Sequence, residues 1–207
     1  GVRVAQHQAV ITAAKHAGVE LLAYTSLLRA DSSPLALAGE HVQTEAAIRA
    51  SGLRHAILRN GWYTENYAMG IPMALQHGAL IGCAGEGRIA SAARADYASA
   101  AAAVLVGDAS GNPVYELAGD DSYTLAELAA ETSRQSGKPV PYVNMSEAEL
   151  KTALIKAGVP EPYAEVRSNS DSGASMGALF DDSHRLSSLT GRATIPMKQS
   201  VAEVLAV

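Results

Sequence analysis

The densest run of side chains able to bind a ligand lies between Asn60 and Asn66, in the order Asn-Gly-Trp-Tyr-Thr-Glu-Asn. Trp62 is the single tryptophan of the chain, and either it or Tyr63 could stack on a flat ring. The amides of Asn60 and Asn66 could bond the edge of such a ring. Gly61 would let backbone amides come close to the ligand. The alternative is a well-packed turn in which Trp62 only anchors two helices.

Two hydroxyl side chains, Thr25 and Ser26, stand at the end of a short apolar run and could border the same ligand. Their alternative role is to cap the turn that follows this run. The residues around Ser26 do not form the Gly-x-Ser-x-Gly pattern of an acyl-transfer serine. A nucleophilic serine is therefore not expected here.

His41 and Glu45 lie four residues apart in a helical pattern over residues 39–51, so they face the same side of that helix. His41 is the candidate proton donor for the ligand, and an exposed helix histidine is the alternative. The six histidines of the chain are scattered without ligand-like spacing, so no metal site is predicted. His55 lies in an apolar run and is expected in the core.

Arg94 is the remaining candidate for ligand binding, because its guanidinium could meet a phosphate or a ribose. It also stands two residues before Asp96 at the start of a predicted helix. An ion pair between Arg94 and Asp96 is therefore an equally good structural explanation.

The elements that would position these residues repeat in a helix–glycine–strand order. Helical patterns over residues 2–17 and 39–51 end at Gly18 and Gly52, 34 residues apart, and strands are predicted at 19–25 and 53–59. Such a period is typical of βα units in a parallel sheet. Ligands bind beyond the carboxyl ends of such strands, so the two candidate segments should border one crevice.

The later elements continue the α/β pattern. A helix kinked at Pro72 is predicted over residues 64–77, a hairpin or loop over 80–89, an alanine-rich helix over 95–107 and a strand over 114–117. Capping boxes at Thr124 and Ser146 open helices that reach Ser136 and Gly158, with a strand near 139–143 between them. The chain from residue 160 to 177 is polar and glycine-containing, and short helices follow near residues 183 and 201–205.

Composition excludes several classes of protein. The 207 residues are 48% hydrophobic and 18% charged, enough for a real core. A net charge of −5 argues against a nucleic-acid partner, and a single cysteine excludes a disulfide framework. The longest apolar stretch, residues 97–106, is too short to span a membrane. A reduced, cytoplasmic protein is expected.

Three segments in this order resemble the NmrA-like branch of atypical short-chain dehydrogenases, and within it the bacterial NAD(P)H:quinone oxidoreductases. The first is Tyr-Thr-Ser-Leu-Leu at residues 24–28, and the second, most specific one is Leu-Arg-Asn-Gly-Trp-Tyr-Thr-Glu-Asn-Tyr at 58–67. The third is Arg-Ala-Asp-Tyr-Ala at 94–98, followed by Tyr-Glu-Leu-Ala-Gly at 115–119. The likeness covers essentially the whole chain.

This resemblance implies a Rossmann-like parallel sheet with a smaller α/β C-terminal lobe, and reduction of quinones by hydride transfer from NADPH or NADH. It places the loop with Asn66 and Tyr67 beside the substrate, and His41 is the local candidate to give that substrate a proton. The cofactor-binding residues that it implies are Thr25, Ser26, Asn60, Gly61, Trp62, Tyr63, Thr64, Glu65 and Arg94. The Tyr-x-x-x-Lys pair of typical short-chain dehydrogenases is absent, which keeps open the alternative of a non-enzymatic NADP-binding redox sensor or regulator.

The resemblance also predicts a gap at the start of the chain. Family members begin with a strand, a glycine-rich loop and a helix that hold the cofactor pyrophosphate. The only glycine cluster here, residues 82–87, lacks that strand–helix context. We expect about the first third of a member to be missing, in a fragment, a truncated gene model or a genuine short variant. Residues 1–110 are then the rest of the cofactor domain and 111–207 the substrate lobe, with interleaved elements; the exposed sheet edge suggests a homodimer.

Overall fold

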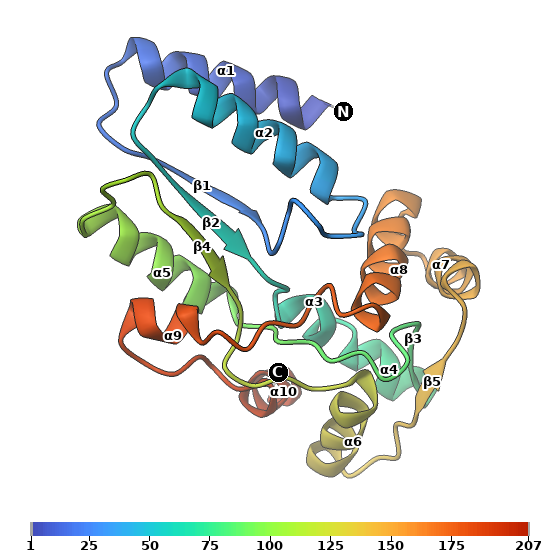
Figure 1. Cartoon of the computed structure of the whole chain (residues 1–207). Coiled ribbons are helices and arrows are strands. Elements are labelled where there is room, and N and C mark those ends of the chain that lie inside the picture. Colours follow the sequence, from blue (N-terminus) through green and yellow to red (C-terminus); the bar gives the residue numbers. More distant parts are fainter. Residues whose placement is uncertain (1, 207) are drawn as a thin grey trace.

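A three-stranded parallel sheet organises the computed structural model, which describes residues 2–206. Its order is β1 (Leu22–Leu27), β2 (His55–Asn60) and β4 (Val114–Leu117). The central strand β2 is buried along all its residues, as a strand covered on both faces should be. Leu27 pairs with Asn60 and Asn60 with Leu117, so the three carboxyl ends meet at one edge of the sheet (Figure 1).

Helices cover both faces of this sheet. On one face α1 (Val2–His16) packs against α2 (Ala38–Ser51), and on the other α5 (Arg94–Val106) packs against α9 (Arg185–Thr190) (Figure 1). Gly52 ends α2 in the left-handed conformation at φ 75°, which a glycine adopts without strain. The predicted helix–strand repeat and the Rossmann-like fold class are confirmed, with the strands beginning two or three residues later than predicted.

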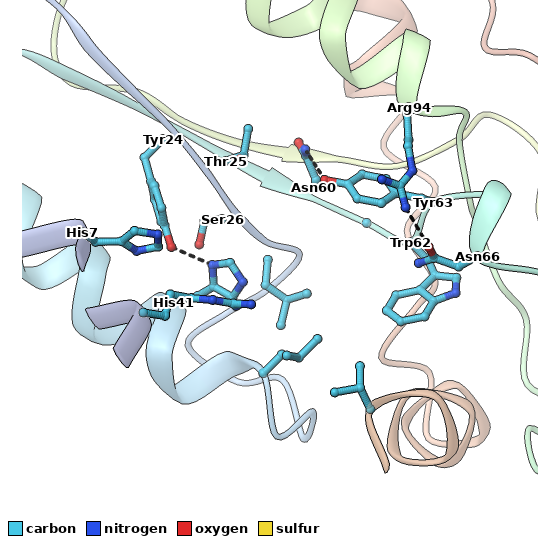
Figure 2. A pocket seen from close by; sticks show the side chains of 15 residues that line it. His7, Tyr24, Thr25, Ser26, His41, Asn60, Trp62, Tyr63, Asn66 and Arg94 are labelled. Atoms are coloured by element: carbon cyan, nitrogen blue, oxygen red, sulfur yellow. Dashed lines mark hydrogen bonds between the residues drawn. The ribbon is translucent and has the colours of Figure 1, made fainter. Parts of the chain in front are cut away.

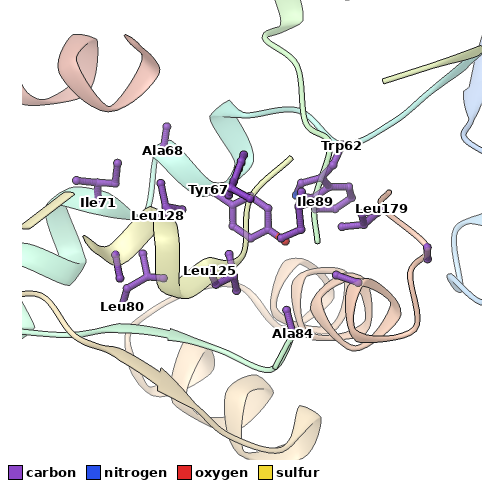
Figure 3. Close-up of a cluster of buried hydrophobic side chains, with 14 of the residues drawn as sticks. Trp62, Tyr67, Ala68, Ile71, Leu80, Ala84, Ile89, Leu125, Leu128 and Leu179 are labelled. Atoms are coloured by element: carbon purple, nitrogen blue, oxygen red, sulfur yellow. The ribbon is translucent and has the colours of Figure 1, made fainter. Parts of the chain in front are cut away.

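The second part of the molecule is mostly helical. A two-stranded parallel sheet of β3 (Leu80–Gly82) and β5 (Tyr142–Asn144) carries helices around it. These helices are α3 (Glu65–Ala68), α4 (Ile71–His77), α6 (Leu125–Ser136), α7 (Glu147–Lys156), α8 (Glu161–Ser175) and α10 (Met197–Leu205). A buried apolar cluster fills the space between them (Figure 3), and it includes Trp62, Tyr67, Ile71, Leu80, Ile89, Leu125, Leu128 and Leu179.

The structure corrects the hairpin prediction for residues 80–89. Leu80 to Gly82 form β3, whose partner is the distant β5 and whose pairing is parallel. A Cβ on Gly82 would lie 2.6 Å from a methyl carbon of Leu125 and 2.9 Å from an oxygen of Asp171. The glycine is there for close packing, whereas its turn-like sequence context suggested a reversal of the chain.

Two helix predictions also need correction. The segment 64–77 forms two separate helices, α3 and α4, and Pro72 stands in the first turn of α4, where a missing N–H costs little. The polar stretch after residue 160 forms the long helix α8. Its polarity concealed the helix because Ser168 and Ser170 are buried and donate to the carbonyl oxygens of Glu165 and Val166 one turn before. Both capping boxes, at Thr124 and Ser146, are confirmed.

The two parts of the molecule interleave along the chain. β4 follows residue 110 and belongs to the first sheet, whereas α3, α4 and β3 precede residue 110 and belong to the helical part. The division into a cofactor domain over residues 1–110 and a substrate lobe over 111–207 stays a prediction.

Candidate functional site

A cleft of about 410 Å³ opens at the carboxyl ends of β1 and β2, where the sequence places its candidate residues. We call this space the cleft. Helices α1, α2 and α8 and the segment after β2 complete its walls (Figure 2). Nine predicted residues line it: Thr25, Ser26, His41, Asn60, Gly61, Trp62, Tyr63, Asn66 and Arg94. Tyr24 and Leu27, both in the first predicted segment, line it too, and four lining residues were not predicted: Arg3, His7, Leu37 and Val166.

The alternation of β1 gives its two hydroxyl residues different roles. Thr25 is exposed, so its hydroxyl is available to a ligand. Ser26 points to the other face of the sheet, is buried, and donates its proton to Oε1 of Glu45 over 2.6 Å. Ser26 therefore joins β1 to α2 on the side of Tyr24 and His41, while Thr25 lies on the side of Asn60 and Tyr63.

Asn60 carries a polar atom that the protein leaves unsatisfied. Its Nδ2 donates weakly to the Tyr63 hydroxyl at 3.4 Å, and its Oδ1 is buried without a hydrogen-bond partner among the described residues. Nε1 of Trp62 is also buried without a hydrogen-bond partner among these residues. Unpartnered buried polar atoms cost free energy and need an explanation. Both belong to lining residues, so a ligand with an amide edge fits their chemistry.

Gly61 serves packing more than ligand approach. Its N–H donates to the carbonyl oxygen of Leu117 over 2.7 Å. A Cβ at this position would lie 3.1 Å from that oxygen and 3.1 Å from the Tyr97 hydroxyl. β4 thus takes the amide of Gly61 itself, and the expectation that this glycine lets backbone amides come close to a ligand stays a prediction.

Trp62 is 7% exposed and packs beside Tyr67 in the apolar cluster, with ring centroids 6.3 Å apart. It thus anchors the segment after β2 while one part of it lines the cleft. Tyr63 lies under the guanidinium of Arg94, whose carbon is 4.8 Å from the ring centroid. Nη2 of Arg94 donates to Oδ1 of Asn66 over 3.1 Å. These contacts hold a positive charge at the rim of the cleft.

The alternative partner of Arg94 is excluded. Oδ1 of Asp96 lies 2.7 Å from Nη1 of Arg192, and Oδ2 of Asp96 accepts the N–H of Ile195 over 2.8 Å. Asp96 therefore ties α5 to the C-terminal segment, and Arg94 stays free to face the cleft.

Three aromatic side chains meet at the opposite wall. The hydroxyl of Tyr24 lies 2.8 Å from Nδ1 of His41, and the ring of His7 packs edge-on against Tyr24 at 5.4 Å (Figure 2). Burial lowers the pKa of His41 below its usual value, and the charges of Arg3 and His7 add to this effect. Burial raises the pKa of Tyr24. His41 is therefore a neutral imidazole beside a protonated phenol at neutral pH.

Three predicted residues do not line the cleft. Thr64 is buried, with its hydroxyl 2.8 Å from that of Ser91. Glu65 accepts the backbone N–H of Arg94 through Oε1 over 2.8 Å and so fixes the start of α5. Tyr67 donates to Oδ1 of Asp171 over 2.9 Å, away from the cleft. Thr64 and Glu65 support lining residues from behind, and their direct ligand roles stay predictions.

A charged network that sequence reasoning missed lies beneath the cleft. Arg59 of β2 donates through Nε and Nη2 to both oxygens of Glu45, over 2.9 and 2.7 Å, and through Nη1 to Glu116 over 3.0 Å. Burial raises the pKa of Glu45, but hydrogen bonds from Arg59 and Ser26 outweigh it and hold that pKa below its usual value. An arginine inside an apolar strand was the available signal, since a buried charge needs partners.

Within residues 2–206 no group of three or more histidine, cysteine, aspartate or glutamate side chains is placed to hold a metal ion. No helix in the described part of the chain is long and apolar enough to cross a membrane.

The comparisons with known proteins agree with each other. The model of the NmrA-like family matches residues 1–181. The chain is 53% identical to quinone oxidoreductase 2 of Escherichia coli (strain K12) over all 207 residues, and it spans 72% of that protein.

Two groups of solved structures are similar. The NADPH-dependent quinone oxidoreductase QOR2 from Escherichia coli, complexed with NADPH, superposes with a TM-score of 0.95 over 99% of this chain and 72% of that one, at 53% identity. The triphenylmethane reductase of Citrobacter sp., complexed with NADP(H), gives 0.91 over 97% of this chain and 71% of that one, at 36% identity.

Proposed function

The chain belongs to the NmrA-like family, and from this premise we propose that it is an NAD(P)H-dependent oxidoreductase that reduces quinones by hydride transfer. The observation that carries the proposal is the 53% identity to a quinone oxidoreductase over the full chain, together with a cleft formed by the candidate residues. The chain spans 72% of the length of that relative. The substrate is accordingly a small molecule.

The residues of the cleft fit a nicotinamide cofactor. Asn60 holds an unpartnered acceptor and Trp62 an unpartnered donor, the two kinds of atom that polar groups of a cofactor bond to. Thr25 presents a free hydroxyl on one wall. Arg94 provides a positive charge at the rim, suited to a phosphate or a ribose. When bound, NADPH or NADH supplies the hydride.

The chain itself supplies orientation and a proton. The ring of Tyr63, held under Arg94, offers a flat surface for a quinone or a nicotinamide. Asn66 lies at the same rim and can bind the substrate. Tyr67, buried next to Asn66 in the sequence, supports Asn66 from the core. His41 on the opposite wall is the proton donor for a quinone oxygen. Most of the rate enhancement then comes from holding two flat rings together with little water between them.

We further propose a reducing, cytoplasmic setting and a homodimer. The thiol of Cys83 is free, which suits a reducing compartment. Strands β1 and β4 are the outer strands of the sheet in the described residues, and an open strand edge is a natural place for association.

The test is a titration of the 207-residue chain with NADPH, followed by Trp62 fluorescence, and an assay of NADPH oxidation with benzoquinone. We expect saturable quenching and steady turnover. Binding without turnover would favour the alternative, an NADP-binding redox sensor. If a chain shown by circular dichroism to be folded gave neither quenching nor turnover, that result would contradict a cofactor function for this chain.

A pair of arginine variants sharpens the titration. Arg94→Ala should weaken NADPH binding about tenfold, because a charged hydrogen bond to the cofactor is lost. Arg54→Ala is the matched control, since Arg54 is exposed and its Nε donates to the carbonyl oxygen of Glu20 before β1. Equal affinities for the two variants would remove Arg94 from the site.

A further inference from the structure

Three rings from three elements form one contact chain at the wall of the cleft. Tyr24 comes from β1, His41 from α2 and His7 from α1. Figure 2 shows the Tyr24 hydroxyl directed at His41, and the two atoms that meet, Oη and Nδ1, are 2.8 Å apart. All three side chains line the cleft. The pair of Tyr24 and His41 is therefore close enough to a ligand to act on it.

The proton positions around His7 follow from its neighbour. The hydroxyl of Thr44 donates its single proton to the carbonyl oxygen of Glu40 over 2.9 Å. Nδ1 of His7 lies 3.0 Å from the same hydroxyl oxygen, which can then only accept. His7 must carry its proton on Nδ1. Its ring is thereby fixed, and with it the edge-on contact that orients Tyr24.

The direction of the bond between Tyr24 and His41 follows from chemistry. A phenol hydroxyl is a good donor, and the unprotonated nitrogen of a neutral imidazole is a good acceptor. The Thr44 hydroxyl also lies near the Tyr24 hydroxyl, but among the described residues the contact of hydrogen-bond geometry is the one with Nδ1 of His41, at 2.8 Å. The hydroxyl therefore donates to Nδ1, and the imidazole carries its own proton on Nε2. Among the same residues Nε2 has no hydrogen-bond partner.

We propose that Tyr24 is a positioning residue: by donating to Nδ1 it fixes His41 in the tautomer that holds a proton on Nε2, available to a quinone oxygen in the cleft. The inference rests on the proposed function for its chemistry, but its geometry belongs to the chain alone.

The proton balance is simple. A quinone that has accepted a hydride carries one negative oxygen and needs one proton. The proton on Nε2 of His41 moves to that oxygen, Nδ1 takes up the hydroxyl proton of Tyr24, and water returns a proton to the Tyr24 oxygen. Both the donor Tyr24 and the product hydroquinone are phenols, so the transfer joins groups of similar acidity.

The surroundings of His41 keep this arrangement neutral. Arg3 and His7 of α1 face it with positive or potentially positive charge, and Glu40 and Glu45 of its own helix α2 face it with negative charge. Tyr24 faces it from β1, and Arg94 lines the far wall of the cleft. Burial, the largest influence, lowers the pKa of His41, so the neutral tautomer is the working form at neutral pH.

Nitrogen-15 NMR of the histidine rings tests the inference without cofactor or substrate. The spectrum of the wild-type chain should show His41, assigned with His41→Gln, with its proton on Nε2. In Tyr24→Phe the other tautomer should become measurable, with a shift of about fivefold in the ratio, and the pKa of His41 should rise because the neutral ring loses its donor. Tyr163→Phe is the control, since Tyr163 is 72% exposed on α8.

The wild-type spectrum alone can overturn the inference. A proton on Nδ1 of His41 would show that Tyr24 accepts the bond, and no positioning of Nε2 would follow. A folded Tyr24→Phe variant in which the tautomer and the pKa of His41 are unchanged would also overturn the inference.

Kinetics with NADPH and benzoquinone gives the functional arm. We expect kcat to fall about tenfold in Tyr24→Phe and in His41→Gln, with KM within about twofold and no further loss in the double variant. A value of kcat for Tyr24→Phe equal to that of Tyr163→Phe, with an active wild type, would contradict the inference. An inactive wild type with the expected tautomer would contradict only the proposed function.

Discussion

Arg59 is buried and Arg167 is half-buried, each beside a carboxylate, but they are built into the molecule in different ways. Arg59 contacts three carboxylates: Glu45 through two nitrogens, Glu116 at 3.0 Å and Asp31 at 2.6 Å. These partners come from different elements and are distant in the sequence. The side chain of Glu45 is 0% exposed and that of Arg59 is 7% exposed.

Arg167 has one carboxylate partner, and it lies on the same helix. Nε of Arg167 is 3.1 Å from Oδ1 of Asp171, four residues later in α8. The guanidinium lies over the ring of Tyr67 at 4.4 Å, and the Tyr67 hydroxyl donates to the same Oδ1 of Asp171 over 2.9 Å. The Arg167 side chain is 21% exposed. The pair thus ties α3 to α8 but keeps some access to water.

The two arginines therefore differ in how many elements of the fold they hold together. The Arg59 network joins β1, β2, β4 and α2 at the edge where the cleft opens, and Glu45 also holds Ser26 and shares its helix with His41. A rigid cleft wall therefore depends on one carboxylate. Asp171 holds α8 against α3, and α8 contributes only Val166 to the lining of the cleft.

The largest effect is expected from Glu45→Gln. It leaves the charge of Arg59 with a weaker set of partners in a dry environment, and breaking such a pair costs several kcal/mol. Because Glu116 and Asp31 remain, we expect a loss of about 3 kcal/mol in the free energy of unfolding. Urea unfolding followed by Trp62 fluorescence and circular dichroism measures it.

The control for this variant is Glu203→Gln, an exposed glutamate on α10. It should stay within about 0.5 kcal/mol of wild type. A loss equally small for Glu45→Gln would mean that the network contributes little and that the comparison of the two pairs is wrong.

The pH dependence of the same pair of proteins sharpens the comparison. The pKa of Glu45 is held below its usual 4.5, mainly by Arg59 and Ser26 against the effect of burial. A lowered pKa in the folded state gives stability that is present above 4.5 and is lost as the pH falls through the folded value. The difference in unfolding free energy between wild type and Glu45→Gln should therefore be constant near pH 7 and shrink below about pH 4.5.

Other carboxylates with lowered pKa, among them Asp120 and Glu149, occur in both proteins and cancel in that difference. A difference that stays constant down to pH 3 would show that the charge of Glu45 does not carry the effect.

Much of the fold and of the cleft could be predicted from the sequence, because local signals were strong there. The stop glycines, the capping boxes at Thr124 and Ser146 and the order of motifs define most elements. Parallel strands bring their carboxyl ends together by geometry, so the segments at Thr25 and Asn60 were bound to meet. The family resemblance supplied the chemistry of the ligand.

The parts that could not be predicted depend on contacts between distant residues. Tyr24 opens the first motif and His7 belongs to none, and only the packing of α1 and α2 on β1 brings both side chains to His41. In the sequence Arg59 is one residue of the second motif, and only the folded structure shows that it contacts three carboxylates. The polar helix α8 is stable because Asp171 and its neighbours find partners inside the protein, which no local periodicity reveals.

A smaller effect than that of Glu45→Gln is expected from Asp171→Asn, with a loss of about 2 kcal/mol in the free energy of unfolding. The asparagine Oδ1 can still accept the Tyr67 hydroxyl, and the partly exposed Arg167 can recover hydration, so the cost should be below that of Glu45→Gln. The same urea experiment measures it, with Asp182→Asn, an exposed position, as the control. The order of the two losses is the sensitive result. Asp171→Asn could instead cost more than Glu45→Gln. The contact of Arg167 with the Tyr67 ring, and not the number of carboxylates, would then decide how much an arginine–carboxylate pair stabilises this protein.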